Sequence, residues 1–137
     1  MIGGCVTSSG EQAANITRTA VLSSGLPESV PAVTIDRQCG SSQQAAAFAA
    51  QGVIAGAYDI VIACGVESMS RVPMGSNAGG ASLGGELLGA RYPDGLVNQG
   101  VAAELVAARW GFSRAELDDF AATSHQRAAE AAGAFEG

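Results

Sequence analysis

Short apolar runs alternate with longer, Ala-rich segments along the first half of the chain. Three of these runs are short and rich in β-branched residues, and they predict strands at residues 2–7, 30–36 and 58–64. The third run reads Tyr-Asp-Ile-Val-Ile-Ala-Cys. Such a continuous apolar run is typical of a parallel strand that is covered on both faces.

Two helices are predicted between these strands. Ser8 and Glu11 have the spacing of a capping box, which predicts a helix from there to about Ser24. A second helix is expected over residues 39–56. The order strand, helix, strand, helix, strand over residues 1–66 predicts an α/β fold with a parallel sheet and right-handed crossovers.

The pattern changes after this core. Gly, Ser, Pro and Asn dominate residues 67–98, and the length of this expected loop region suggests a functional loop or a linker. Helices are predicted again at residues 101–110 and 114–132, the latter after Ser113 and Glu116, which again have capping-box spacing. We therefore expect one domain over residues 1–137, with a βαβαβ core (1–66), a long loop region (67–98) and a helical segment (99–137).

Composition excludes several classes of protein. Apolar residues make up 47% of the chain and charged residues 15%, which indicates a globular domain and not a disordered one. The net charge is −6, all seven basic residues are Arg, and none form a run, so we expect no nucleic-acid partner. Residues 40–58 carry no charge but contain two Ser and three Gln, which favours a helix buried in protein and not a membrane span.

The three cysteines suggest reduced thiols. Cys5, Cys39 and Cys64 are odd in number and lack CxxC or metal-ligand spacing, so neither a disulfide framework nor a metal site is expected. The first residues include no basic stretch followed by an apolar one, so no secretory signal is predicted. A cytoplasmic location follows from these two expectations.

Cys39 is the candidate nucleophile. It lies where a predicted buried strand ends and a long uncharged helix begins, and reactive groups collect at the carboxyl ends of parallel strands. The first helical turn favours the thiolate by about 0.3–1 kcal/mol, so a strong nucleophile also needs a nearby base. Gly40 allows a thioester to approach closely. From position alone, a buried and inert thiol is an equally good interpretation.

Several segments resemble one family. The sequence Asp-Arg-Gln-Cys-Gly-Ser-Ser-Gln-Gln-Ala at residues 36–45 closely resembles the nucleophile motif of thiolases. The resemblance continues in the same order through four further segments, residues 3–18, 63–70, 99–104 and 110–114, and so covers essentially the whole chain.

This resemblance implies the fold of a thiolase N-terminal half and an acyl-CoA acyltransferase of fatty acid metabolism. Such enzymes, the acetyl-CoA acetyltransferases and 3-ketoacyl-CoA thiolases, transfer an acyl group between CoA and a carbon nucleophile through an acyl-cysteine. Cys39 would accept the acyl group, and the loop region would cover the pantetheine arm. Leu96 would contact pantetheine. Acyl-CoA would be the substrate, with no permanently bound cofactor and no metal, and the full-length parent would be a homo-oligomer.

The sequence also departs from the family. Asn98 and Gln99 replace a His-Met pair, so Gln99 is expected either to line the acyl pocket and change its preference or to face solvent at a helix start. The family's second half supplies a histidine before proline and a cysteine in Cys-x-Gly. Here His125 is interpreted as a helix-surface residue. Neither Cys5 nor Cys64 lies in a Cys-x-Gly turn, and Cys64 is interpreted as a core residue.

We therefore expect a partial N-terminal domain. The family's first strand would be central in the sheet, and its absence would leave a gap between the remaining strands. An alternative to the acyltransferase is a catalytically inactive fragment, or a piece that docks on a full-length thiolase through residues 35–37. A ketoacyl-synthase-type enzyme is a third hypothesis, which the Glu-Ser-Met-Ser turn at residues 67–70 disfavours.

Overall fold

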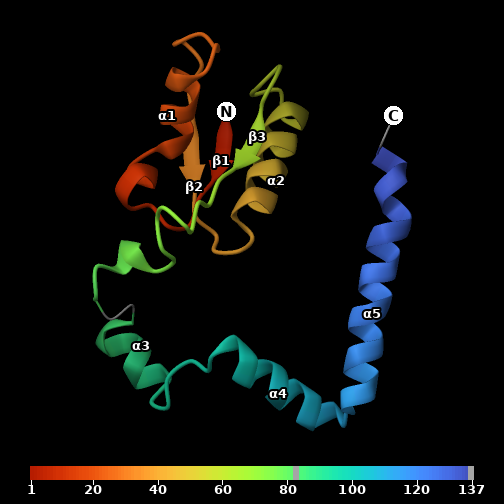
Figure 1. Cartoon of the computed structure of the whole chain (residues 1–137). Coiled ribbons are helices and arrows are strands. Elements are labelled where there is room, and N and C mark those ends of the chain that lie inside the picture. Colours follow the sequence, from red (N-terminus) through yellow and green to blue (C-terminus); the bar gives the residue numbers. More distant parts are fainter. Residues whose placement is uncertain (82–83, 136–137) are drawn as a thin grey trace. The chain divides into compact units, whose positions relative to one another are not determined.

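The computed structural model describes residues 1–81 and 84–135 (Figure 1). The chain divides into two compact units, Met1–Leu83 and Gly84–Gly137, and each is considered by itself. The first unit contains β1 (Ile2–Gly4), α1 (Ile16–Ser23), β2 (Val33–Ile35), α2 (Ser41–Ile54) and β3 (Ala63–Gly65), with 3-10 turns at Gly10–Gln12 and Ser76–Ala78. The second contains α3 (Gly85–Arg91), α4 (Gln99–Trp110), α5 (Arg114–Ala131) and a 3-10 turn at Ala132–Phe135.

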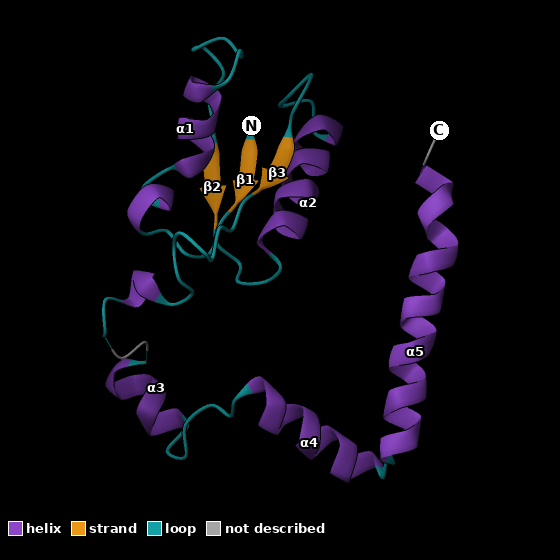
Figure 2. Cartoon of the chain, viewed as in Figure 1, coloured by secondary structure: helices purple, strands orange, loops and turns teal. Residues whose placement is uncertain are grey.

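The three strands form one parallel sheet in the order β2-β1-β3 (Figure 2). Gly3 of β1 lies opposite Thr34 on one side and Cys64 on the other. The predicted α/β fold with a parallel βαβαβ core is therefore confirmed. The expected gap is wrong, because β1 itself occupies the centre and hydrogen-bonds to both neighbours.

The glycines of β1 decide which helix covers which face. Successive residues of a strand point to opposite faces. A Cβ at Gly3 would meet the Thr17 side chain of α1 at 2.2 Å, and a Cβ at Gly4 would meet the backbone of Ser42 in α2 at 2.5 Å. The two helices therefore pack directly on opposite faces of β1, and no side chain fits between strand and helix.

The core is built from small residues. On the α2 face, Ile2 packs with Ala45 and Ala49, and Ile35 and Val61 lie partly buried against them. On the α1 face Val21 is fully buried. Edge positions are far more open: Val33 of β2 is 48% exposed. The prediction that the third strand is covered on both faces is thus wrong, since Ile62 just before β3 is 43% exposed.

The first predicted helix begins later than expected. The Ser8–Glu11 capping box does not form, because the Ser8 hydroxyl donates to the carbonyls of Gln12 and Ala14 while Glu11 pairs with Arg71. Ala14 has a left-handed φ of 58°, which breaks the chain direction after a short 3-10 turn. α1 then starts at Ile16 with Asn15 as its N-cap.

Other boundaries also differ from prediction. Each strand has three paired residues, because β1 spans only Ile2–Gly4 and limits the ladder on both sides. The helix predicted over residues 39–56 is confirmed as α2, Ser41–Ile54. The expected loop region 67–98 contains the 3-10 turn Ser76–Ala78 and α3. Neither element was predicted, because this part of the sequence is rich in glycine. Residues 82 and 83 of this predicted loop lie outside the described residues.

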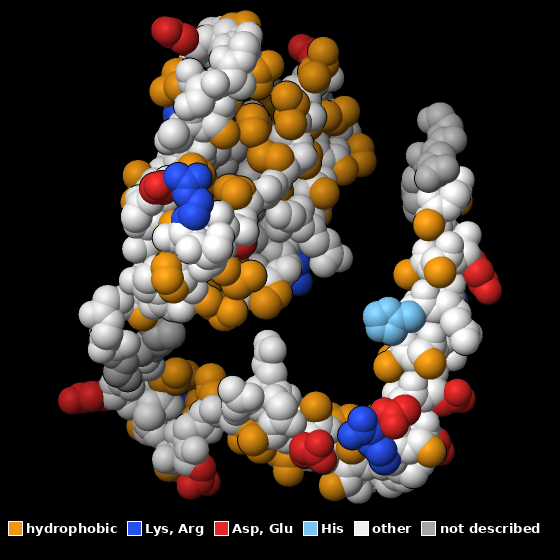
Figure 3. Space-filling model, viewed as in Figure 1, with side chains coloured by type: hydrophobic (Ala, Val, Ile, Leu, Met, Phe, Trp, Pro, Cys, Tyr) orange, Lys and Arg blue, Asp and Glu red, His pale blue; other side chains and the backbone are white. Residues whose placement is uncertain are grey.

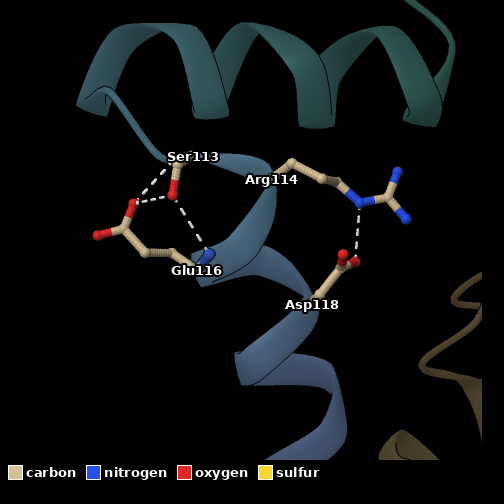
Figure 4. A network of polar contacts seen from close by, with 4 residues as sticks. All are labelled: Ser113, Arg114, Glu116 and Asp118. Atoms are coloured by element: carbon tan, nitrogen blue, oxygen red, sulfur yellow. Dashed lines mark hydrogen bonds and ion pairs between the residues drawn. The ribbon is translucent and has the colours of Figure 1, made fainter.

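The helix start predicted at Ser113 is confirmed (Figure 4). The Ser113 hydroxyl accepts the Glu116 backbone N–H at 3.3 Å, and the Glu116 carboxylate accepts the Ser113 backbone N–H at 2.8 Å. The Ser113 backbone N–H, followed by the Ser113 hydroxyl, which also donates to this carboxylate at 2.8 Å, lowers the pKa of Glu116. Arg114 and Asp118 add an exposed ion pair one turn further on. Across residues 1–81 and 84–135, no helix combines the length and apolar character that a bilayer span requires.

Candidate functional site

A pocket of about 280 Å³ opens at the carboxyl ends of the three strands. Two of its walls are the ends of β1 and β3, at residues 4–6 and 65–67. The third wall is the turn from β2 into α2, which contributes Gln38, Cys39, Ser41 and Ser42. This is the edge of a parallel sheet where ligands usually bind. Cys39 is exposed there, so the alternative of a buried thiol is wrong, and its role as nucleophile stays a prediction.

The turn that carries Cys39 is held by two side chains. Asp36 Oδ1 accepts the Gln38 backbone N–H at 2.8 Å, and Gln38 adopts a left-handed φ of 49°. The buried Ser41 hydroxyl accepts the Arg37 N–H at 2.9 Å and donates to the Gln38 carbonyl at 2.5 Å. An L-residue in this region needs such support, because the conformation is unfavourable by itself. The sequence predicted the position of Cys39 but not this bracing.

The start of α2 lies directly on the sheet beside Cys39. Gly4 and Gly65 permit this approach, since a Cβ at Gly65 would lie 1.9 Å from Ser42 Oγ. The backbone N–H groups of Ser42 and Gln43 belong to the first helical turn, where an intrahelical acceptor is lacking. Ser42 also lines the pocket. The helix end is therefore placed to favour negative charge near Cys39.

A polar cluster joins the ends of β1 and β3 beneath the pocket. The Glu67 carboxylate accepts the backbone N–H groups of Val6 and Thr7, the latter at 2.9 Å. Gln12 is 3% exposed; its amide nitrogen donates to the Thr7 carbonyl at 2.9 Å and to Glu67 at 3.3 Å. Its amide oxygen accepts the Ser68 N–H at 2.7 Å. Every polar atom of the Gln12 side chain is thus engaged.

This cluster sets the charge state of two groups. Burial raises the pKa of Glu67, but the N–H groups of Thr7 and Val6 and the Gln12 amide outweigh it and bring the pKa below its ordinary value. Burial, followed by the negative charge of Glu67, raises the pKa of Cys5. Cys5 is 1% exposed, yet it lines the same pocket as Cys39. All three cysteines are free, and Cys64 is half-buried.

The other predicted site residues belong to the second unit. Leu96 is 69% exposed, and Gln99 is the exposed first residue of α4. The Asn98 side chain caps this helix by accepting the Gly100 N–H at 3.0 Å. His125 is exposed on α5, as expected for a helix-surface residue. The roles of Leu96 and Gln99 as substrate contacts stay predictions.

Gln12 and Glu67 were missed as pocket-forming residues. Their polar side chains were available as a signal, since Glu67 comes two residues after a strand end and could have been assigned to the same edge as Cys39. Gln12 carried no such signal, because its turn was predicted to be helix. Within residues 1–81 and 84–135, no group of His, Cys, Asp and Glu side chains is arranged to hold a metal ion.

Comparison with known proteins gives a consistent result. The family model described as thiolase, N-terminal domain, matches residues 1–136. The chain is 43% identical to a steroid 3-ketoacyl-CoA thiolase of Mycobacterium tuberculosis, over 99% of the chain and 36% of that protein. It is 43% identical to a 3-ketoacyl-CoA thiolase of Bacillus subtilis, over 96% of the chain and 33% of that protein. It is 48% identical to a peroxisomal 3-ketoacyl-CoA thiolase A of Mus musculus, over 85% of the chain and 27% of that protein. The chain therefore spans about a third of the length of these relatives.

Proposed function

The chain belongs to the thiolase family through its N-terminal domain, and from this premise we propose that it acts in thiolase-type acyl transfer with Cys39 as the acyl acceptor. The single observation that carries the proposal is an exposed thiol in a pocket at the carboxyl ends of three parallel strands. The relatives' names support acyl-CoA, and 3-ketoacyl-CoA in particular, as the substrate class.

The proposed reaction proceeds in two transfers. In thiolysis, the Cys39 thiolate attacks the 3-keto carbon, a carbon–sulfur bond forms, and the bond between C2 and C3 breaks. The electron pair stays on C2, which takes up a proton and leaves as acetyl-CoA. The thiol of a second CoA then displaces Cys39 and loses its proton, which gives the shortened acyl-CoA. Condensation is the same sequence in reverse.

The pocket supplies part of what these steps require. The left-handed turn at Gln38 leaves the Cys39 thiol exposed in the pocket, beside the first turn of α2. The ten residues that line the pocket include no imidazole, and the one carboxylate among them, Glu67, is already bonded to Val6, Thr7 and Gln12. We therefore propose that the base that removes the Cys39 proton comes from outside them. We propose that Leu96 contacts the pantetheine arm and that Gln99 contributes to acyl preference, both from the family resemblance.

A second candidate function is a non-catalytic docking piece. β2 is an edge strand among the described residues, and Val33 on it is 48% exposed. An open parallel edge is able to pair with another chain. This observation favours association through β2 and the residues that follow it, with a second copy or with a longer thiolase. The three free thiols support a reducing compartment such as the cytoplasm.

Incubation of the purified chain with acetyl-CoA tests the proposal. We expect an acetyl group on Cys39 in the peptide mass spectrum together with release of CoA, and faster labelling when imidazole in the buffer supplies a base. Cys39→Ser should abolish labelling, whereas Cys64→Ser, which changes a half-buried thiol outside the pocket, should retain it. No acetylation with imidazole present, under conditions that label a complete thiolase, would favour the docking piece.

A further inference from the structure

Glu67 and Gln12 do not carry the acyl group, yet they join three segments around the pocket. Glu67 follows β3, Val6 and Thr7 follow β1, and Gln12 lies in the 3-10 turn before α1. Six of the ten lining residues belong to the two strand ends that these contacts hold together, at 4–6 and 65–67. Sheet pairing ends at Gly4 and Gly65, followed by one backbone bond from the Val66 N–H to the Gly4 carbonyl at 3.0 Å, so the cluster holds the part of the wall that lies beyond these bonds.

We propose that Glu67 is a positioning residue that, with Gln12, fixes this wall of the Cys39 pocket and so places the thioester for attack. The second part rests on the proposed acyl transfer. The first part, that the two residues form a clamp between the strand ends, does not depend on it.

Removal of the Glu67 side chain leaves the clamp without its acceptor. Glu67 accepts from three donors: two backbone N–H groups, both on the same carboxylate oxygen, and the Gln12 amide nitrogen on the other. A glutamine would keep an oxygen for the two backbone N–H groups, so Glu67→Ala is the variant that removes all three bonds. Rotation of the Gln12 amide would not replace the lost acceptor, because its oxygen accepts from Ser68 and its nitrogen donates to Thr7. Donors left without partners are unfavourable, and Gln12 is 3% exposed, so the strand ends should separate.

The clamp also keeps the pocket's second thiol covered. The Gln12 amide nitrogen lies 3.5 Å from Cys5 Sγ, and Cys5 is 1% exposed while Cys39 is open. Loosening the clamp should therefore expose Cys5 to thiol reagents without changing the access to Cys39. This gives a signature that separates a shifted wall from general unfolding, in which all three thiols react.

The test compares the full chain with Glu67→Ala and with Glu11→Ala. Glu11 is a matched control, because Glu11→Ala makes the same change of charge and side-chain size in an exposed ion pair with Arg71, outside the pocket. In Glu67→Ala we expect amide hydrogen exchange at Val6 and Thr7 to accelerate at least about tenfold and Cys5 to become alkylated by iodoacetamide. Acetylation of Cys39 should slow by roughly 10- to 100-fold, while its alkylation changes less than about twofold.

The exchange rates test the clamp, and the acetylation rate tests the positioning role of Glu67. Unchanged exchange at Val6 and Thr7 in Glu67→Ala would overturn the clamp, and faster exchange with undiminished acetylation would overturn the positioning role. If the unmodified chain takes no acetyl group, the proposed function and its positioning residue fail together, and the exchange rates still decide the clamp.

Should Glu67→Ala not fold, acidification of the unmodified chain replaces it. Protonation of Glu67 removes its negative charge and turns one of its two oxygens into a donor, which weakens its bonds to the three N–H donors, while the Cys5 thiol in the same cluster stays neutral. Protection of Val6 and Thr7 should then fall before that of the α2 interior. Equal loss at both places would overturn the clamp.

Discussion

Replacement of Gly4 by alanine tests whether direct contact of α2 with the sheet positions Cys39. The added Cβ would lie 2.5 Å from Ser42 N, 2.7 Å from the Ser41 carbonyl carbon and 2.9 Å from Ser41 Cβ. Two of these atoms are backbone, so no change of rotamer relieves the contact. The helix start has to move away from β1 by nearly an ångström to restore an ordinary contact of about 3.4 Å.

The expected cost follows from this displacement. Overpacking of a well-packed core costs about 1–3 kcal/mol, and a backbone clash belongs at the upper end of that range. A shift of about 1 Å in a reactive group can also lower its rate by about 100-fold. We therefore expect Gly4→Ala to lose about 3 kcal/mol of unfolding free energy and to acetylate Cys39 far more slowly than the unmodified chain does.

Urea unfolding followed by circular dichroism measures the first effect, with a lower midpoint at an unchanged slope. Gly25→Ala is the matched control, because nothing lies within 4 Å of its added Cβ. That variant should be neutral or about 0.4–1 kcal/mol more stable. The reasoning would be refuted if both variants unfolded within about 0.5 kcal/mol of each other.

Three further predictions follow from the described contacts. Ser41→Ala should lower the unfolding free energy by about 1–3 kcal/mol in urea unfolding, because it removes both hydrogen bonds of a buried hydroxyl; a change below about 0.5 kcal/mol would contradict the bracing of the Cys39 turn. Asn15→Ala should cost about 1–2 kcal/mol in the same measurement, since Asn15 caps α1 and also bonds β2 through Thr34, and an unchanged midpoint would refute this. Because the folded pKa of Glu67 is lowered, its contribution to stability is complete above the ordinary carboxyl pKa and is lost as pH falls through the lowered value. Acid titration of the unfolding midpoint should therefore be flatter in Glu67→Gln than in Glu11→Gln.

The parts of the fold that local chemistry decides could be predicted from the sequence. The alternation of apolar runs and Ala-rich segments correctly predicted the parallel sheet, and the uncharged stretch after Cys39 correctly predicted α2. The Ser113–Glu116 pair was predicted correctly because both partners lie within one helical turn. The position of Cys39 at a strand end and before a helix followed from the same local pattern.

What distant contacts decide could not be predicted. Ser8 and Glu11 have the spacing of a capping box, but an ion pair with Arg71 takes the carboxylate away from the helix start. The Glu67 clamp likewise joins residues about 60 positions apart, as the bonds to Val6 and Thr7 show. The predicted strand lengths were wrong for a related reason. The apolar run before β3 has no strand partner beyond Ile2–Gly4, and Ile60 in this run is 90% exposed.

Hydrophobic side chains gather on the visible surface of the first unit and along α4 (Figure 3). Among the exposed hydrophobic residues of the first unit, Ile54 and Ile60 are 86% and 90% exposed, and Trp110 of α4 is 60% exposed. Periodicity identified such residues as members of helices and strands. It could not indicate which of them would be covered, because that depends on the packing partner and not on the segment itself.

The central position of β1 has a consequence for the order of folding. Gly3 pairs with Thr34, 31 residues later, and with Cys64, 61 residues later. Closing the longer loop costs only about 0.6 kcal/mol more than closing the shorter one. The pairing of β1 with β3 therefore comes later than its pairing with β2 mainly because β3 is synthesised later. At about 5–20 residues per second, β1 waits roughly 3–12 s for β3 to leave the ribosome. During that interval the chain can pair β1 with β2, but it lacks the strand end that completes the wall opposite Cys39. We therefore expect the thiol to become reactive toward its substrate only in the last stage of folding of this unit.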